Sequence, residues 1–180
     1  NFFDGVIVKK GDFLEIYCPE SSVKYFSVVY EDDNIIVVNK AFGIIVSTKD
    51  KTRQYELSLQ ELVEKEIRHK LFPLHRIDMN TSGLVIFCKK QKVFNEMKEV
   101  MKGHGVEKVY LAEVVGCYNL PPMLHKAYLT KNSKDHSVRV EKTKFSDRAM
   151  LIETFVELVE QKETTSIVRV KISNGKTHQI

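Results

Sequence analysis

The chain has 180 residues, of which 43% are hydrophobic and 29% are charged, and its formal net charge is +4. This composition is typical of a folded globular domain and excludes an intrinsically disordered chain. No apolar run reaches the roughly 18 residues of a membrane-spanning helix, and the first residues lack the basic and apolar regions of a signal peptide. We therefore expect a cytoplasmic protein without a membrane segment.

Three cysteines, Cys18, Cys88 and Cys117, are spread along the chain and form no CxxC pair. Scattered cysteines of odd number are typical of buried, reduced thiols in a cytoplasmic protein. The six histidines form no HExxH motif and no paired Cys/His spacing. We therefore expect neither disulfides nor a metal site.

Residues 1–20 form the first expected unit. Two short apolar stretches flank Lys10-Gly11-Asp12, a pattern typical of a β-hairpin between residues 5 and 18. Residues 21–25 are expected to be a linker, and residues 26–180 the main domain. Because a lone hairpin is marginally stable, it must pack on the rest of the chain or belong to a domain that starts before Asn1.

The main domain alternates strands with two helices. Runs of β-branched and apolar residues predict strands at residues 28–30, 35–40, 44–46, 84–88, 106–116, 151–159 and 167–172. Ser58 and Glu61 match a capping box, and the apolar spacing after them predicts a helix that extends to Leu71 and is stopped by Pro73. A second amphipathic helix is predicted at 91–102. Strands dominate, which predicts an α+β domain.

The segment 75–83 joins the first helix to the next strand. A loop held by core elements at both ends is a common place for catalytic side chains. This one carries a cation and a carboxylate two residues apart, Arg76 and Asp78, followed by Thr81-Ser82-Gly83, which suits a hydrogen-bonded turn. From the residues alone, the segment is either a catalytic loop or a surface loop with a structural Asp–Arg pair.

The sequence of residues 75–89, His-Arg-Ile-Asp-Met-Asn-Thr-Ser-Gly-Leu-Val-Ile-Phe-Cys-Lys, resembles the central motif of the RluA-type pseudouridine synthases, which isomerise uridine in ribosomal and transfer RNA. Residues 30–40, 108–116 and 175–180 resemble three further motifs of this family, in the same order along the chain. The resemblance covers about residues 26–180. The hairpin at 5–18 resembles the final strands of an S4 RNA-binding domain, which often precedes this catalytic domain.

The resemblance implies an α+β catalytic domain with a central mixed, mainly antiparallel sheet, flanking helices and a cleft along the sheet. It also implies isomerisation of uridine without a cofactor or a metal ion. The expected partner is RNA, with ribosomal RNA first and transfer RNA second, and we expect a monomer. Basic clusters at 68–70, 89–92 and 131–144 are compatible with an RNA surface, although they are equally compatible with solvated faces.

Carried over position by position, the resemblance makes Asp78 the catalytic nucleophile and Tyr110 the ring that stacks on the flipped target base. It implies RNA contacts for Arg76 and Lys176. The residues expected to support the loop and the cleft are His75, Thr81, Ser82, Gly83, His178 and Gln179. An ionised Asp78 suits the positive charge that develops on the sugar as a glycosidic bond breaks. In a partly dry cleft this carboxylate needs a cationic neighbour.

Two positions bear on that expectation. The family places an arginine directly after His-Gln-Ile, and this sequence ends at Ile180, so we expect the domain to be incomplete at its C-terminal end. Lys176 stands where the family has arginine, which keeps the charge and loses the bidentate geometry. A catalytically inactive RNA-binding or assembly factor on the same fold is therefore a second interpretation. A carbohydrate hydrolase is disfavoured, because no comparable loop offers Asp78 a second carboxylate.

Overall fold

The computed structural model describes residues 24–48, 57–102, 106–131 and 137–172, together with Gly175 and Gln179. The hairpin predicted at residues 5–18, with its S4-like resemblance, lies outside the described residues. Cys18, Lys176 and His178 lie outside them as well.

Nine strands and two helices make up this described part of the chain. In chain order they are β1 (Phe26–Glu31), β2 (Ile35–Lys40), α1 (Leu59–Ile67), β3 (Phe72–Pro73), β4 (Gly83–Cys88), α2 (Gln91–Lys102), β5 (Lys108–Val115), β6 (Met123–Lys131), β7 (Val138–Glu141), β8 (Met150–Gln161) and β9 (Thr165–Ile172). Neither helix has the length and apolar character needed to span a lipid bilayer. The predicted α+β class is confirmed.

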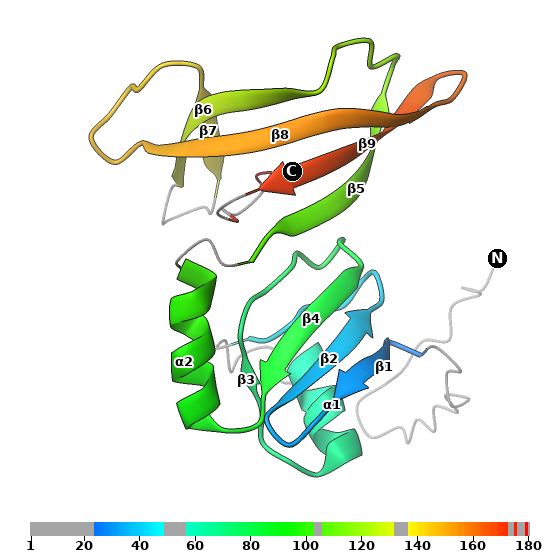
Figure 1. Cartoon of the computed structure of the whole chain (residues 1–180), viewed down its shortest axis with the longest axis vertical. Coiled ribbons are helices and arrows are strands. Elements are labelled where there is room, and N and C mark those ends of the chain that lie inside the picture. Colours follow the sequence, from blue (N-terminus) through cyan, green and yellow to red (C-terminus); the bar gives the residue numbers. More distant parts are fainter. Residues whose placement is uncertain are drawn as a thin grey trace, which may run out of the picture.

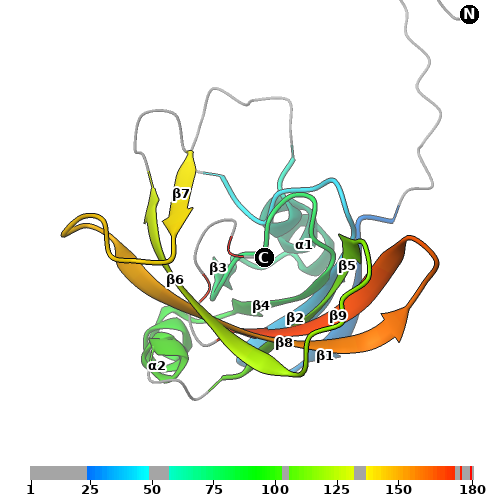
Figure 2. The ribbon, with the colours of Figure 1, turned by 90° about the horizontal axis from the view of Figure 1, so that it is seen from above.

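The strands form two antiparallel sheets, which Figure 1 shows one above the other. The first sheet has the order β1-β2-β4-β3, and the second has the order β5-β9-β8-β6-β7. The buried side chains of α1, Leu59 and Val63, pack with Ile36, Val38 and Phe87 in the core of the first sheet. Figure 2 shows α2 on the other side of this sheet. The first sheet is thus covered by a helix on each face.

The second sheet has one face that packs into a small apolar core, while its other face is exposed and carries both charged and apolar side chains. Along β9, Val168, Val170 and Ile172 are buried and form a small core with Tyr110 of β5. The alternate position Arg169 points the other way and pairs with Glu157 at 2.7 Å. Because successive side chains of a strand point to opposite faces, this alternation sets which side of the sheet β5 and β9 present to the interior.

Most predicted elements of the main domain are confirmed to within two residues at each end. The short strands β3 and β7, and the longer β6, have no counterpart among the predictions. In β6 the only side chain classed as buried is Leu129, at 1% exposure. Such a strand lacks the apolar alternation on which sequence-based assignment depends, and its pairing with β7 and β8 is a tertiary result.

The strand predicted at residues 44–46 is wrong. These residues are next to the start of α1, where the carbonyl of Ile45 accepts a hydrogen bond from Leu59 N at 2.8 Å and that of Val46 accepts one from Gln60 N at 2.9 Å. The first N–H groups of a helix have no partner within the helix. The segment satisfies these groups, and its buried side chains pack into the core without any strand pairing.

Helix α1 is also shorter than predicted. It ends at Ile67, and Arg68 adopts a left-handed conformation with φ of 54°. Leu71 lies beyond the helix, although it is only 1% exposed. Its apolar character therefore reflects the core that it enters after the turn, and not a continuation of the helical face.

The two described cysteines differ in their environments. Cys88 at the end of β4 is buried, whereas Cys117 is exposed, and both are free thiols. The expectation that the thiols are buried is therefore wrong for Cys117. Cys117 follows Gly116, which has a φ of 88°, and precedes Tyr118, which packs against the core of the second sheet.

The capping box predicted at the start of α1 is present. Ser58 N and Ser58 Oγ both donate to Glu61 Oε2 at 2.7 Å, and Ser58 Oγ accepts from Glu61 N at 3.4 Å. The carboxylate of Glu61 has a lowered pKa, because the Ser58 backbone and side chain donate to its charged form. The box thus ties the first turn of α1 to the segment that precedes it.

Replacing Ser58 by alanine should lower the free energy of unfolding by about 1 kcal/mol, because the first turn of α1 loses its side-chain cap. Urea denaturation measures this change. Ser146→Ala, at an exposed loop position, is the matched control and should change stability by less than about 0.5 kcal/mol. Equal stability of the two variants would contradict the role of the cap.

Candidate active site

The predicted catalytic loop leaves the first sheet beside another loop. Lys40 is the last residue of β2 and Gly83 the first residue of β4, and the two are partners across the antiparallel pair. The chain after Lys40 and the chain before Gly83 therefore emerge at the same end of neighbouring strands. Gly83 has a φ of 123°, a conformation that side chains disfavour, and this allows the loop to turn into β4.

A buried lysine joins these two loops. Lys40 is 1% exposed, and its Nζ donates to the carbonyl oxygens of Ala41 at 2.9 Å, Ile44 at 2.7 Å and Met79 at 3.1 Å. The same Met79 oxygen accepts from Gly43 N at 2.9 Å. We refer to Lys40 with its three carbonyl partners as the Lys40 cage. It fixes the residue that directly follows Asp78.

The loop presents Asp78 to solvent. The backbone turns tightly after it, with Thr81 N donating to Asp78 O at 3.0 Å. Asp78, Met79 and Asn80 are exposed, as is Arg76. The backbone beneath Asp78 is thus held while its carboxylate stays accessible, which is what a group that meets a macromolecular substrate requires.

His75 joins the other end of the loop to β4. Leu74 N donates to Ile86 O at 3.0 Å in the manner of a strand pair, and Ile86 N donates to Nε2 of His75 at 3.3 Å. Where β3 ends and the loop begins, the imidazole of His75 accepts the hydrogen bond that a backbone carbonyl would accept in a continued strand pair. An accepting Nε2 requires a neutral ring with its proton on Nδ1.

Tyr110 of β5 lies within electrostatic range of Asp78. Burial raises the pKa of the Tyr110 hydroxyl, and the Asp78 carboxylate raises it further. Burial lowers the pKa of Lys40, and the same carboxylate acts in the opposite direction. The charge of Asp78, on a loop of the first sheet, therefore acts both on Tyr110 of the second sheet and on the ammonium group of Lys40.

Lys108, at the start of β5, adds a second cation. Burial lowers the pKa of His75, and the positive charge of Lys108 lowers it further. Lys108 and Tyr110 are two residues apart in one strand, so they lie on the same face of the second sheet. The site thus combines Asp78, Tyr110, His75 and two lysines.

The remaining predicted residues fall into three groups. Gln179 is anchored to β8, where its Nε2 donates to Glu153 O and to Thr154 Oγ1, both at 3.1 Å. Thr81 and Ser82 lead from the turn at Met79 and Asn80 to Gly83, the first residue of β4. Lys176 and His178 lie outside the described residues, so their implied roles stay predictions.

Neither lysine of the site was among the predicted residues. The sequence held a signal for Lys40, because Ile36, Val38 and Lys40 alternate along β2 and all three are buried. A lysine at the third inward position of a strand breaks the apolar pattern and indicates a buried charge with polar partners. Lys108 offers no comparable local signal, since its importance depends on what faces it.

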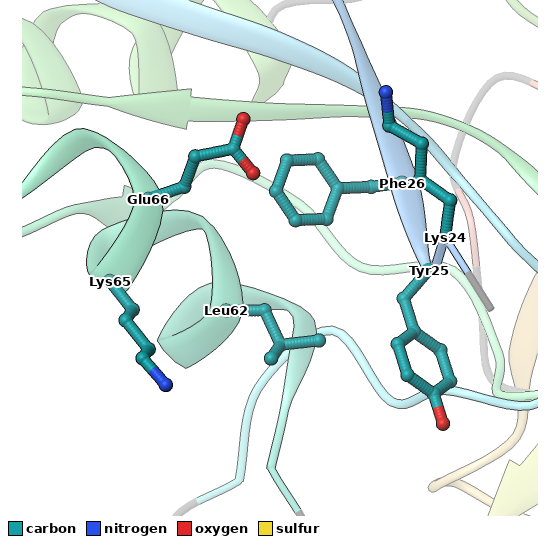
Figure 3. Close-up of a pocket in the computed structure, with 6 residues that line it drawn as sticks. All are labelled: Lys24, Tyr25, Phe26, Leu62, Lys65 and Glu66. Atoms are coloured by element: carbon teal, nitrogen blue, oxygen red, sulfur yellow. The ribbon is translucent and has the colours of Figure 1, made fainter. Parts of the chain in front are cut away.

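A separate hollow lies away from these residues. It has a volume of about 420 Å³ and is lined by Lys24, Tyr25, Phe26, Leu62, Lys65 and Glu66. Figure 3 shows the α1 side chains across from those that precede and begin β1. Among the described residues, no three His, Cys, Asp or Glu side chains are grouped in a way that could hold a metal ion.

The sequence pattern of one protein family, described as RNA pseudouridylate synthase, matches residues 34–180. The chain is 32% identical to an uncharacterised RNA pseudouridine synthase of Mycoplasma genitalium, over 94% of this chain and 54% of the relative. It is 27% identical to ribosomal large subunit pseudouridine synthase C of Vibrio parahaemolyticus, over 85% of this chain and 47% of that protein. The chain therefore spans about half the length of these curated relatives.

A solved structure has the same fold. Human RNA pseudouridylate synthase domain containing 1 aligns with a TM-score of 0.73 at 22% identity, over 90% of this chain and 65% of that one. At this level of identity the likeness shows the fold and not the function. The arrangement of sheets and helices is thus one that pseudouridylate synthase domains adopt.

Replacing Lys40 by methionine should lower the free energy of unfolding by at least about 2 kcal/mol, because carbonyl groups at a buried position lose their donor. Urea denaturation provides the measurement. Lys92→Met is the matched control, since the Lys92 side chain is 88% exposed. If both variants unfold at the same urea concentration, the Lys40 cage does not hold the loop.

The lowered pKa of His75 makes stability depend on pH. Between the folded pKa and the ordinary value of 6.5, the unfolded chain binds more protons than the folded protein, so stability rises with pH and levels off above about 6.5. His75→Gln keeps an acceptor without titration and should flatten this rise, as measured by unfolding at pH 5 to 7.

Lys108→Met should raise the pKa of His75 in an NMR titration, and a lower value would contradict the charge effect.

Proposed function

The chain belongs to the RNA pseudouridylate synthase family, and on that premise we propose that it converts uridine to pseudouridine in RNA with Asp78 as the nucleophile. One observation carries the assignment to this residue. Asp78 is exposed on a loop whose backbone is held by the Lys40 cage, and its charge acts on the hydroxyl of Tyr110. A fixed carboxylate whose charge reaches an aromatic side chain suits chemistry on an extruded base.

The reaction rearranges one nucleotide without adding or removing atoms. The bond between N1 of uracil and C1′ of ribose breaks, the base turns, and a bond forms between C5 and C1′. The proton on C5 is released, and N1 takes up a proton. As the first bond breaks, positive charge develops on the sugar, and an ionised carboxylate either stabilises this charge or bonds to the carbon.

Tyr110 has a separate role in this proposal. A uridine inside folded RNA is not accessible to Asp78, so the base must leave its stack, which costs a few kcal/mol. Stacking of the base on an aromatic ring contributes about 1–3 kcal/mol and offsets part of that cost. Arg76, exposed two residues before Asp78, and Lys176 are proposed to contact the RNA around the flipped nucleotide.

We propose large-subunit ribosomal RNA as the first substrate to examine. The motif resemblance favours it, and the Vibrio relative is by name a ribosomal large subunit enzyme. Transfer RNA is the second substrate class. Nucleotide-resolution mapping of pseudouridine in cells with and without the gene identifies the target, and an unchanged map in the deletion strain would contradict the proposal.

Asp78→Asn in the full-length protein should reduce pseudouridine formation by at least about a thousandfold, because the neutral amide cannot serve as the nucleophile. Tritium release from C5-labelled uridine in the mapped RNA measures the reaction. Asp33→Asn is the matched control, because Asp33 is an exposed aspartate in the turn between β1 and β2. Both variants should bind RNA as the wild type does.

The same experiment tests the second interpretation. An inactive RNA-binding or assembly factor would bind RNA and release no tritium even as the wild-type, full-length protein. Activity that survives in Asp78→Asn would instead assign the chemistry to a different side chain. Either result would contradict Asp78 as the nucleophile.

A further inference from the structure

We propose that Lys108 binds a phosphate group of the RNA beside the target uridine, an inference that rests on the proposed function and adds a substrate contact to it. Lys108 begins β5 and pairs with Ile172 of β9. In Figure 1, β5 is the strand of the second sheet drawn nearest to the first sheet. Lys108 is half-buried on the face that also carries Tyr110.

Two neighbours define the position of the Lys108 ammonium group. Its charge acts on the imidazole of His75, which sits at the base of the catalytic loop. The ammonium group also lies near Gly175, because a Cβ atom placed on that residue would be 4.0 Å from Lys108 Nζ. The cation therefore lies within electrostatic range of the loop that carries Asp78 and close to the residue that starts the last motif of the chain.

No carboxylate of a described residue forms an ion pair with Lys108. The adjacent Glu107 pairs with Lys171 at 3.4 Å. The residues from 173 to 180, Ser-Asn-Gly-Lys-Thr-His-Gln-Ile, include no Asp or Glu. A half-buried cation without an ion-pair partner among the described residues favours an anionic ligand.

The spacing within β5 suits a nucleotide. Two residues along a strand are separated by about 7 Å, so a base stacked on Tyr110 leaves its own phosphate within reach of Lys108. A lysine ammonium binds phosphate as a point charge with three donors. Phosphate contacts fix the register of a nucleic acid without reading its sequence, so Lys108 would position the uridine while Asp78 carries out the chemistry.

The test compares Lys108→Met, Lys108→Arg and the control Lys65→Met in the full-length protein, because Lys65 is exposed on α1 and lines the hollow away from the site. The probe is an unmodified transcript of the RNA in which the pseudouridine mapping places the target, with large-subunit ribosomal RNA as the expected one, and its Kd is measured over a range of salt concentrations. Loss of one phosphate contact should make the plot of log Kd against log salt shallower by about 0.7–0.9. Lys108→Arg and Lys65→Met should retain the wild-type slope.

Kinetics separate binding from two other roles. The proposal expects Lys108→Met to raise KM about tenfold with little change in kcat at saturating RNA. An unchanged salt slope overturns it. If the acid limb of the kcat profile moves while the slope stays constant, Lys108 is a counter-charge for Asp78, and if only the melting temperature falls, its role is structural. Should Lys108→Met not fold, Lys108→Gln replaces it in the same comparison.

The outcomes also separate this inference from the proposed function. If the wild-type protein binds the transcript and forms no pseudouridine, the proposed function fails, and the salt slopes still decide the role of Lys108. If the wild type forms pseudouridine and Lys108→Met matches it in slope and KM, only the Lys108 contact fails. If the wild type does not bind the RNA, both are overturned.

Discussion

The ammonium group of Lys40 lies within 3.1 Å of three backbone carbonyl oxygens at a position where the side chain is almost completely excluded from solvent. A buried cation is costly unless hydrogen bonds replace its hydration, and the carbonyls of Ala41, Ile44 and Met79 do so. Met79 directly follows Asp78, so the hydrogen bond from Lys40 to the Met79 carbonyl also holds the loop that carries Asp78. The position of that loop therefore depends on the buried charge of Lys40.

The two sheets supply different parts of the site. The first sheet holds the loop from both ends, because His75 accepts a hydrogen bond from Ile86 N of β4 and the Met79 carbonyl accepts one from Lys40 Nζ. The second sheet contributes the start of β5, which brings Tyr110 and Lys108 toward that loop. A change in the relative placement of the two sheets would separate the carboxylate from the ring without breaking either sheet. The site therefore depends on how the two sheets are placed relative to each other.

Charge in the site is balanced over several groups. From the sequence we expected a cationic neighbour for Asp78, and the family motif places that cation directly after Ile180. The described part of the chain contains a different cation, Lys40, and the Asp78 carboxylate acts on its pKa. His75 is kept neutral by burial and by Lys108. The imidazole of His75 can therefore accept the hydrogen bond from Ile86 N, and the charge of Lys108 remains available for a ligand.

Local patterns in the sequence determined much of the fold. The capping box at Ser58, the amphipathic helix α2 and the apolar strands β2 and β4 follow from residue order alone, as did the selection of Asp78 and Tyr110 by resemblance to family motifs. The sequence could not place Lys108 in the site or show that residues 44–46 satisfy the start of a helix. Those outcomes depend on groups far apart in the chain, and only tertiary packing brings their charges and unpaired hydrogen-bonding groups together.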